Sequence, residues 1–173
     1  NQAVNDFSRA IELLPDDADH YQIRAEAYVK LGNLRNAIAD FGHAIKFAPQ
    51  NPAGYIGRGG AYRQRGKFRH ALKDFNQAIE LAPDDPTIYN DRGLVYLDWG
   101  DFQNAISDFG RAVDLFSELP DWNDVHVVAL VNRAAAYTDS GSFQKAIADL
   151  HHATQIDPDY IAAYYVRGIA YQG

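Results

Sequence analysis

A 34-residue period constrains the fold of this chain more than any other feature of its sequence. Tyrosine recurs with this step at Tyr28, Tyr62 and Tyr96, and again from Tyr137 to Tyr171. Glycine, alanine and proline follow the same steps in further columns: Gly32, Gly66, Gly100 and Gly141; Ala37, Ala71, Ala105 and Ala146; Ala10, Ala44, Ala78, Ala112 and Ala153; Pro15, Pro49, Pro83 and Pro158. A fixed period in several independent columns predicts a solenoid, in which each repeat buries its apolar face only against its neighbours.

Each period contains two stretches with helical spacing and a glycine between them. Tyr55, Gly59 and Tyr62 lie at i, i+4 and i+7, which places them on one face of a helix. Asn51 followed by Pro52 is typical of a helix start, because asparagine caps helices and proline is tolerated in the first turn. Glycine at the turn allows the left-handed backbone that joins two helices. The predicted fold class is therefore all-α, built from helix pairs.

The residue types in these columns resemble the tetratricopeptide repeat. The matching residues of one period are Tyr55, Gly59, Tyr62, Gly66, Ala71, Phe75, Ala78 and Pro83. The resemblance covers essentially the whole chain and implies a right-handed superhelical solenoid of antiparallel helix pairs. One column departs from the family, which usually has leucine where this chain has Arg24, Arg58, Arg92, Arg133 and Arg167.

The period divides the chain into segments of one predicted solenoid domain. The predicted segments are the second helix of a truncated repeat at 1–17, repeats at 18–51, 52–85 and 86–117, an insertion at 118–126 that contains Trp122, a repeat at 127–160, and the first helix of a truncated repeat at 161–173. The insertion is predicted because the step from Gly100 to Gly141 is seven residues longer than the period. The chain starts in mid-repeat and has no methionine, so we interpret it as a piece of a longer protein.

Composition narrows the classes of partner. The formal net charge of −7 and the pI near 5.2 argue against nucleic acid as the main partner, since that binding depends on clustered lysine and arginine. The chain lacks cysteine and therefore any disulfide or thiolate metal site. It has no long apolar run, so no direct membrane insertion is expected. The compartment stays open, with the cytoplasm favoured because no targeting segment is present.

No motif in the sequence indicates catalysis. The six histidines show no pair at i, i+4 of the metal-ligand type, and the glycines occupy turns or packing columns instead of a phosphate-binding loop. No serine or carboxylate is placed by a motif for nucleophilic or acid–base chemistry. We therefore predict a non-enzymatic protein with no cofactor and no metal.

The first helix of each repeat carries a second stripe of residues, about 100° round the helix from the packing stripe. In the tetratricopeptide-repeat family the corresponding face lines a concave groove that binds an extended peptide or a helix. The resemblance implies these groove residues: Gln22, Glu26, Ile56, Gly60, Arg63, Asn90, Asp91, Leu94, Leu97, Val131, Asn132, Tyr165 and Ile169. The stripe changes from repeat to repeat while the packing stripe is nearly constant, as expected for a shared scaffold with a locally specified surface.

The charges of this stripe favour a basic and apolar peptide or amphipathic helix as the partner. Trp99 and Trp122 are predicted as secondary contacts, because tryptophan is enriched in interface hot spots. For Tyr165 and Ile169 an alternative stays open, in which both residues pack against a following helix instead of a partner.

Chaperone-binding members of the family grip an acidic C-terminus with a clamp of Lys, Asn and Arg. The matching positions here are Gln22, Glu26, Gly57, Thr87 and Asp91. These residues lack the cations that hold a carboxylate, and the acidic ones repel it. We therefore predict no chaperone binding of this kind.

The recurring arginines are interpreted as structural. Asp6, Asp40, Asp74, Asp108 and Asp149 recur in the second helices, so each arginine has a candidate carboxylate in the second helix that precedes it. Because a partly buried arginine needs a paired acceptor, we predict a ladder of ion pairs.

The sequence thus predicts a protein–protein interaction scaffold that binds its partner in the groove. Two alternatives remain. One is self-association into a homo-oligomer through the apolar ends of the array and the insertion. The other is a substrate-docking segment of a larger enzyme.

Overall fold

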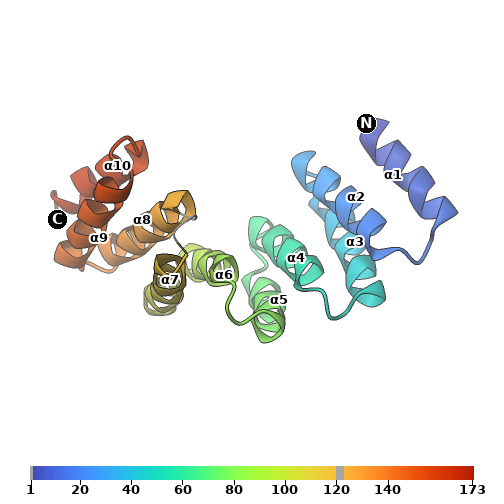
Figure 1. The fold of residues 1–173 in the computed structure, drawn as a ribbon, viewed down its shortest axis with the longest axis horizontal. Coiled ribbons are helices and arrows are strands. Elements are labelled where there is room, and N and C mark those ends of the chain that lie inside the picture. The colour runs from blue at the N-terminus through green and yellow to red at the C-terminus, as the bar shows by residue number, and fades with distance from the viewer. Residues whose placement is uncertain (1, 120–122) are drawn as a thin grey trace. The chain divides into compact units, whose positions relative to one another are not determined.

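A computed structural model describes residues 2–119 and 123–173 of the chain. The described residues form ten helices and no strand, so the predicted all-α fold of helix pairs is confirmed (Figure 1). The helices belong to two compact units, Asn1–Pro83 and Asp84–Gly173.

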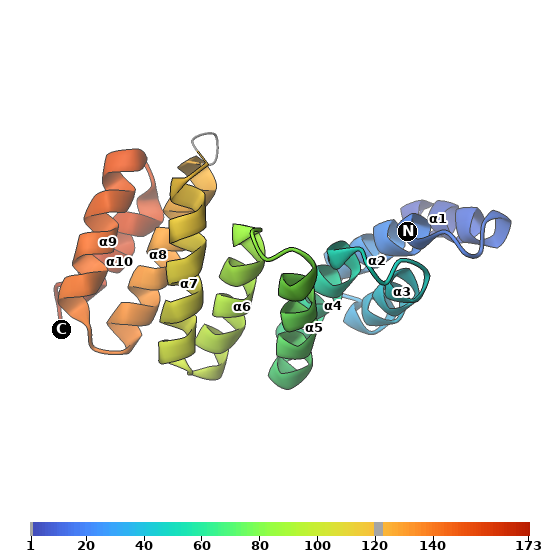
Figure 2. The ribbon, with the colours of Figure 1, turned by 60° about the horizontal axis from the view of Figure 1, so that its bottom comes forward.

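The first unit contains five helices joined by short turns. They are α1 (Gln2–Leu13), α2 (Ala18–Lys30), α3 (Leu34–Phe47), α4 (Pro52–Gln64) and α5 (Phe68–Leu81). Each helix packs against the next one in the chain, and α2 also packs against α4 (Figure 2). The first helices of two consecutive repeats, α2 and α4, are therefore in direct contact.

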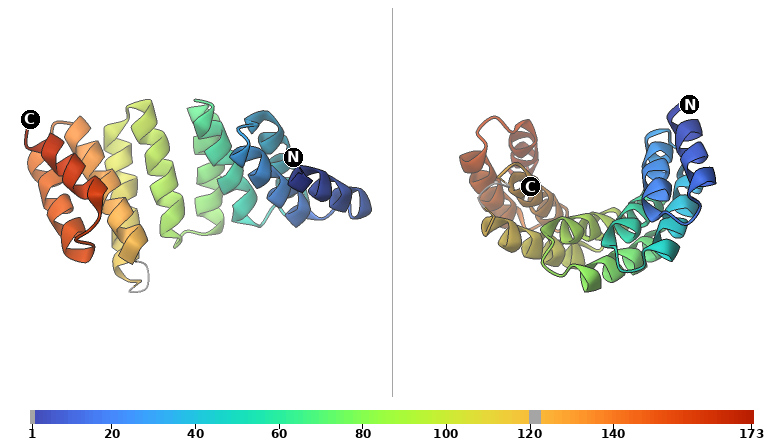
Figure 3. Two further views of the ribbon diagram at one scale, coloured as in Figure 1. Left: turned by 90° about the horizontal axis from the view of Figure 1, so that it is seen from above. Right: turned by 45° about the vertical axis from the view of Figure 1, so that its right-hand side comes forward.

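The second unit repeats this arrangement. It contains α6 (Pro86–Trp99), α7 (Phe102–Ser117), α8 (Asn123–Asp139), α9 (Phe143–Ile156) and α10 (Ile161–Ala170). Again each helix packs against its successor, and the first helices form the additional contacts α6 with α8 and α8 with α10 (Figure 3).

Local signals in the sequence set the helix boundaries. Asp17, Asn51 and Asp85 cap α2, α4 and α6, each accepting a hydrogen bond from the backbone N–H two residues later. The turns between paired helices use glycines with positive φ, between 67° and 81°, at Gly32, Gly66, Gly100 and Gly141. The predicted role of this glycine column is thereby confirmed.

The core of each unit is built from the small and aromatic columns of the repeat. The alanines at Ala37, Ala71, Ala105 and Ala146 are fully buried. The aromatic column of the second helices is buried as well, with Phe41, Phe75 and Phe109 at most 2% exposed and Leu150 in the same column fully buried. Small residues let neighbouring helices approach closely, and the aromatic rings then fill the space between them.

The seven additional residues before the fourth complete repeat mostly lengthen helices. α7 has 16 residues where α3 and α5 have 14, and α8 begins at Asn123, four positions before the predicted repeat start at 127. Residues 123–126 of the predicted insertion are thus the first turn of α8. Trp122 lies outside the described residues.

Candidate functional site

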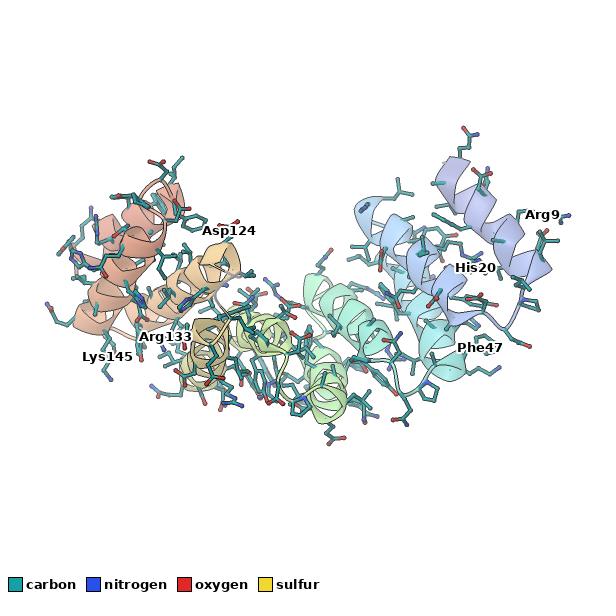
Figure 4. The ribbon with its side chains drawn as sticks, in the orientation of Figure 1. Arg9, His20, Phe47, Asp124, Arg133 and Lys145 are labelled. Atoms are coloured by element: carbon teal, nitrogen blue, oxygen red, sulfur yellow. The ribbon has the colours of Figure 1, made fainter. Side chains whose placement is uncertain are left out.

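Four arginines of the first helices bind aspartates of the second helices in bidentate pairs. In the pair of Arg24 with Asp40, the Nε–Oδ2 distance is 2.6 Å and the Nη2–Oδ1 distance is 2.8 Å. The other three pairs have the same geometry: Arg58 with Asp74, Arg92 with Asp108, and Arg133 with Asp149. Arg133 is labelled on α8 in Figure 4.

The predicted role of these arginines is confirmed, but the predicted partners were wrong. Each aspartate follows its arginine by 16 residues and belongs to the same helix pair, whereas the sequence analysis chose the aspartate of the preceding pair. Hydrogen bonds to Asp74 raise the pKa of Arg58 against the opposing effect of burial. For Arg133 burial is the larger influence and lowers the pKa, yet the hydrogen bonds and the charge of Asp149 together raise it. These guanidiniums are thus committed to the scaffold and unavailable for an anionic ligand.

A pocket of about 280 Å³ lies between α2 and α4 in the first unit. Its lining comprises Glu26, Val29, Lys30, Phe41, Ile56, Gly57, Gly60, Ala61 and Gln64. Three of the predicted groove residues, Glu26, Ile56 and Gly60, are among them. The structure therefore brings these three residues together around a mostly apolar hollow with a charged rim.

Gly57 and Phe41 approach each other closely in the lining of this pocket. A Cβ atom at Gly57 would overlap with the Phe41 ring, which is only 2% exposed and cannot move aside freely. Phe41 is on the second helix of its repeat and lies outside the predicted groove residues, whereas Gly57 occupies the column of Asp91 and Asn132, which adjoins the predicted stripe. Gly57 lies in the column that has Ile23, Asp91, Asn132 and Val166 in the other repeats, so a lone glycine in this column is the sequence signal that could have predicted the close approach.

The remaining predicted residues of the first unit lie beside the pocket. The Gln22 side chain donates a hydrogen bond from Nε2 to Oε1 of Glu26 over 3.2 Å. Arg63, half-buried, lies on α4 one turn beyond Gly60. Lys30 and Gln64 also line the pocket, from a column that adjoins the predicted groove stripe.

The equivalent positions of the second unit are packed. Leu94 and Leu97 lie two periods after Glu26 and Val29, and they pack against the cluster of Phe109 and Ala136. Val131 is 7% exposed and belongs to the core, so its side chain is not a surface contact.

The remaining predicted groove residues of the second unit are either polar and half-buried or exposed. Asn132 donates from Nδ2 to Oδ1 of Asn90 over 2.9 Å, which links α8 to α6. Asp91 is half-buried beside Asn90. On α10, Tyr165 and Ile169 are 71% and 43% exposed.

The predicted secondary contacts have different outcomes. Trp99 is 46% exposed at the end of α6, whereas Trp122 lies outside the described residues. Among the helices described, none is both long and apolar enough to cross a membrane.

Family comparisons agree with the repeat geometry. A model described as TPR repeat matches residues 59–100 and 134–173, and one described as Tetratricopeptide repeat matches residues 18–51 and 86–118. This chain belongs to the tetratricopeptide-repeat family. Tetratricopeptide repeats are generally non-catalytic protein-interaction modules, and solenoids of this kind present extended binding surfaces.

Solved tetratricopeptide-repeat structures share the fold of the chain. YrrB, described as a TPR protein with an unusual peptide-binding site, is 23% identical with a TM-score of 0.73, over 96% of this chain and 82% of YrrB. A thermophilic TPR protein of Thermus thermophilus is 23% identical with a TM-score of 0.75, over 98% and 89%. MamA of Desulfovibrio magneticus is 16% identical with a TM-score of 0.79, over 92% and 86%. No curated protein matches the sequence.

Proposed function

We propose that this tetratricopeptide-repeat chain binds a peptide segment of a partner protein on the exposed face of its first helices, without catalysis. The pocket between α2 and α4 is the observation that carries the proposal, because it places an apolar hollow among Glu26, Ile56 and Gly60. The family supports a protein partner, and the description of YrrB as having a peptide-binding site supports a peptide.

The size of the pocket favours one side chain of a peptide over a whole small molecule. Small-molecule sites usually enclose roughly 300–1,000 Å³ and bury most of the ligand. At about 280 Å³ and open to solvent, this pocket is just below that range. A peptide side chain brings its own backbone, which hydrogen-bonds outside the pocket.

The charge of the partner is expected to differ along the chain. In residues 84–173, Asp and Glu number 14 and Lys and Arg number 5, which favours a basic segment at the second unit. In residues 1–83, Lys and Arg number 11 against 9 Asp and Glu. The basic and apolar partner that the sequence predicts is therefore proposed for the second unit.

The proposal is tested with peptides selected on the protein from a randomised library. Ile56→Asp places a carboxylate in the pocket wall, and Ile161→Asp makes the same change at a side chain that is 82% exposed on α10. Binding by calorimetry is expected to weaken about tenfold or more for Ile56→Asp and to stay unchanged for Ile161→Asp, with circular dichroism showing equal helix content. Equal binding by both variants would contradict the proposal.

Self-association is a second candidate function. Ile161, Tyr165 and Tyr171 are 82%, 71% and 63% exposed on or just after α10, which is unusual for large apolar side chains in one short helix. Light scattering over a concentration series distinguishes the candidates, because self-association increases the apparent mass with concentration and peptide binding does not.

A further inference from the structure

Helix α4 contains four glycines in 13 residues, although glycine is among the least favourable residues in a helix interior. Close packing accounts for three of them. A Cβ at Gly54 would lie 2.9 Å from Cγ1 of Ile45, one at Gly57 would overlap with Phe41, and one at Gly59 would lie 3.1 Å from Cε2 of Phe75. Any larger residue at these positions displaces a neighbour.

Gly60 has no such packing reason. A Cβ at Gly60 meets no atom within 4 Å, because the residue borders the pocket between α2 and α4. The same position in the other first helices carries a side chain in every case: Glu26, Leu94, Ala135 and Ile169. The scaffold therefore accepts side chains in this column, and at Gly60 the missing side chain is what leaves the space open.

We propose that Gly60 keeps a socket open for one large apolar side chain of a partner peptide, and that an acidic residue adjoins this side chain in the peptide. The inference rests on the proposed function and names the ligand of that same pocket. Phe41, Ala61, Val29 and Ile56 give the socket apolar walls, which suit an aromatic or large aliphatic side chain. Gly60 is thus a specificity-determining residue of the site.

The acidic neighbour follows from the charges at the rim. Glu26 already accepts a hydrogen bond from Gln22, whereas Lys30 forms no ion pair within residues 2–119 and 123–173. Arg65 and Lys67 add exposed positive charge just beyond the end of α4. A carboxylate next to the apolar side chain can pair with Lys30 in the pocket lining, and Arg65 and Lys67 follow Gln64, which also lines the pocket.

Blocked hexapeptides test this proposal directly. The probe is acetyl-Gly-Ser-Trp-Asp-Ser-Gly-amide, whose ends carry no charge, so that a terminal carboxylate cannot account for binding. The comparison peptides replace Trp with Ala or Asp with Lys. Each peptide is titrated to roughly 2 mM against ¹⁵N-labelled protein, because a single anchored side chain gives millimolar affinity.

The Trp-Asp peptide is expected to shift the backbone amide signals of Gly57, Gly60 and Gln64. Replacing Trp or Asp in the peptide is expected to weaken the effect about tenfold or more. Gly60→Leu is expected to abolish the shifts of Gly57 and Gln64, while Gly168→Leu is expected to bind like the natural chain. Gly168 is a suitable control, because its Cβ also meets no atom within 4 Å and it lies on α10.

The outcomes separate this inference from the proposed function. Undiminished binding by Gly60→Leu, or equal binding of the Trp-Asp and Trp-Lys peptides, overturns the inference while peptide binding to the first helices stands. Failure of library-selected peptides to perturb any first helix overturns the proposed function itself. If Gly60→Leu unfolds, Gly60→Ala serves in its place, with a smaller loss of binding expected and the melting temperature raised.

Discussion

The contact between α2 and α4 in the first unit and the contact between α6 and α8 in the second are built from the same repeat columns. Around Gly57 and Gly60 the first contact leaves an open pocket. In the second, Leu94 and Leu97 pack against Phe109 and Ala136, and Asn132 is hydrogen-bonded to Asn90. The same scaffold therefore forms either an open pocket or a packed contact between two first helices. A few side chains outside the repeat pattern decide which of the two is formed.

The two units also differ in charge while they share their structural ion pairs. The first unit has a small excess of positive charge, and the second has 14 acidic against 5 basic residues. The bidentate Arg–Asp pairs occur in both with the same geometry. The scaffold is thus common to the units, whereas the surface is specific to each.

Breaking an ion pair is expected to have the largest effect, and a similar one in each unit. Asp74→Ala in the first unit and Asp108→Ala in the second remove the bidentate carboxylates that bind the half-buried Arg58 and Arg92. Each change is expected to lower the free energy of unfolding of its unit by about 2–3 kcal/mol. Hydrogen exchange measured by mass spectrometry resolves the two units. A loss confined to one of the two variants would show that the pairs are not equivalent.

Alanine is expected to have opposite effects at two glycines of α4. Gly57→Ala should destabilise the first unit by about 1–3 kcal/mol, because the Cβ overlaps with the buried Phe41 ring. Gly60→Ala should stabilise the same unit by about 0.5–1 kcal/mol, because alanine favours the helix and the Cβ meets nothing. Urea denaturation measures both changes. A destabilising Gly60→Ala would mean that the pocket is not open at this position.

Removing the asparagine pair of the second unit is expected to have a smaller effect. Asn132→Ala removes the hydrogen bond to Asn90, which is only half-buried and can bind water instead. The expected loss is about 1 kcal/mol of unfolding free energy. Asn36→Ala, at an exposed position of α3, serves as the control and should change stability little. Equal effects of the two changes would argue that the hydrogen bond between Asn132 and Asn90 does not stabilise the contact between α6 and α8.

Mild acid is expected to weaken the second unit through His126, with the smallest effect of the series. Burial, then the charges of His152 and Arg133, lower the pKa of His126 below 6.5. His126 is 6% exposed and its ring meets that of His152 edge to face. The unfolded chain therefore binds a proton at His126 more readily than the folded chain does. The stability contributed by neutral His126 is complete above about pH 6.5, the pKa of an unperturbed histidine. It is lost as the pH falls toward the lower pKa that His126 has in the folded protein.

Fluorescence provides the measurement, since both tryptophans belong to the second unit. Its urea midpoint should fall between pH 7.5 and 5.5, and His126→Leu should reduce that fall. An unchanged pH dependence in His126→Leu would assign the effect to another group.

The helix pairs and turns could be predicted well from the sequence, because each local signal for a helix or a turn occurs again at the same position in several repeats. For example, glycine recurs at the same position in four repeats, and this recurrence predicts the positive φ that Gly32 adopts. The partners of Arg24, Arg58, Arg92 and Arg133 could not be decided by periodicity, because each of them has one aspartate of the column before it and one after it. The insertion provided a signal that the sequence analysis did not use. It lengthens the step from Asp108 to Arg133 by seven residues, while Arg133 to Asp149 keeps the 16 residues of the other repeats.

The site was predicted less completely than the fold. Periodicity places Glu26, Ile56 and Gly60 on one face, and the pocket includes all three. Periodicity also placed Val131 on that face. However, the face on which a residue lies does not determine how deeply its side chain is buried between two helices. The side chains on the facing helix decide whether a position of the repeat borders a pocket or is packed. Leu94, for example, packs against Phe109.

The short sequence separation of the ion pairs makes each helical hairpin electrostatically self-contained. Both charges of a pair come from one continuous segment of two helices, so a hairpin can be duplicated, deleted or moved without leaving an unpaired charge in its neighbours. The additional residues lengthen the end of α7 and the start of α8, outside the segments that join each arginine to its aspartate, and so alter none of these spacings. Short sequence separation also favours rapid folding, because little loop entropy is lost before the pair forms. The chain is thus assembled from segments that can each close their own ion pair as soon as they are synthesised.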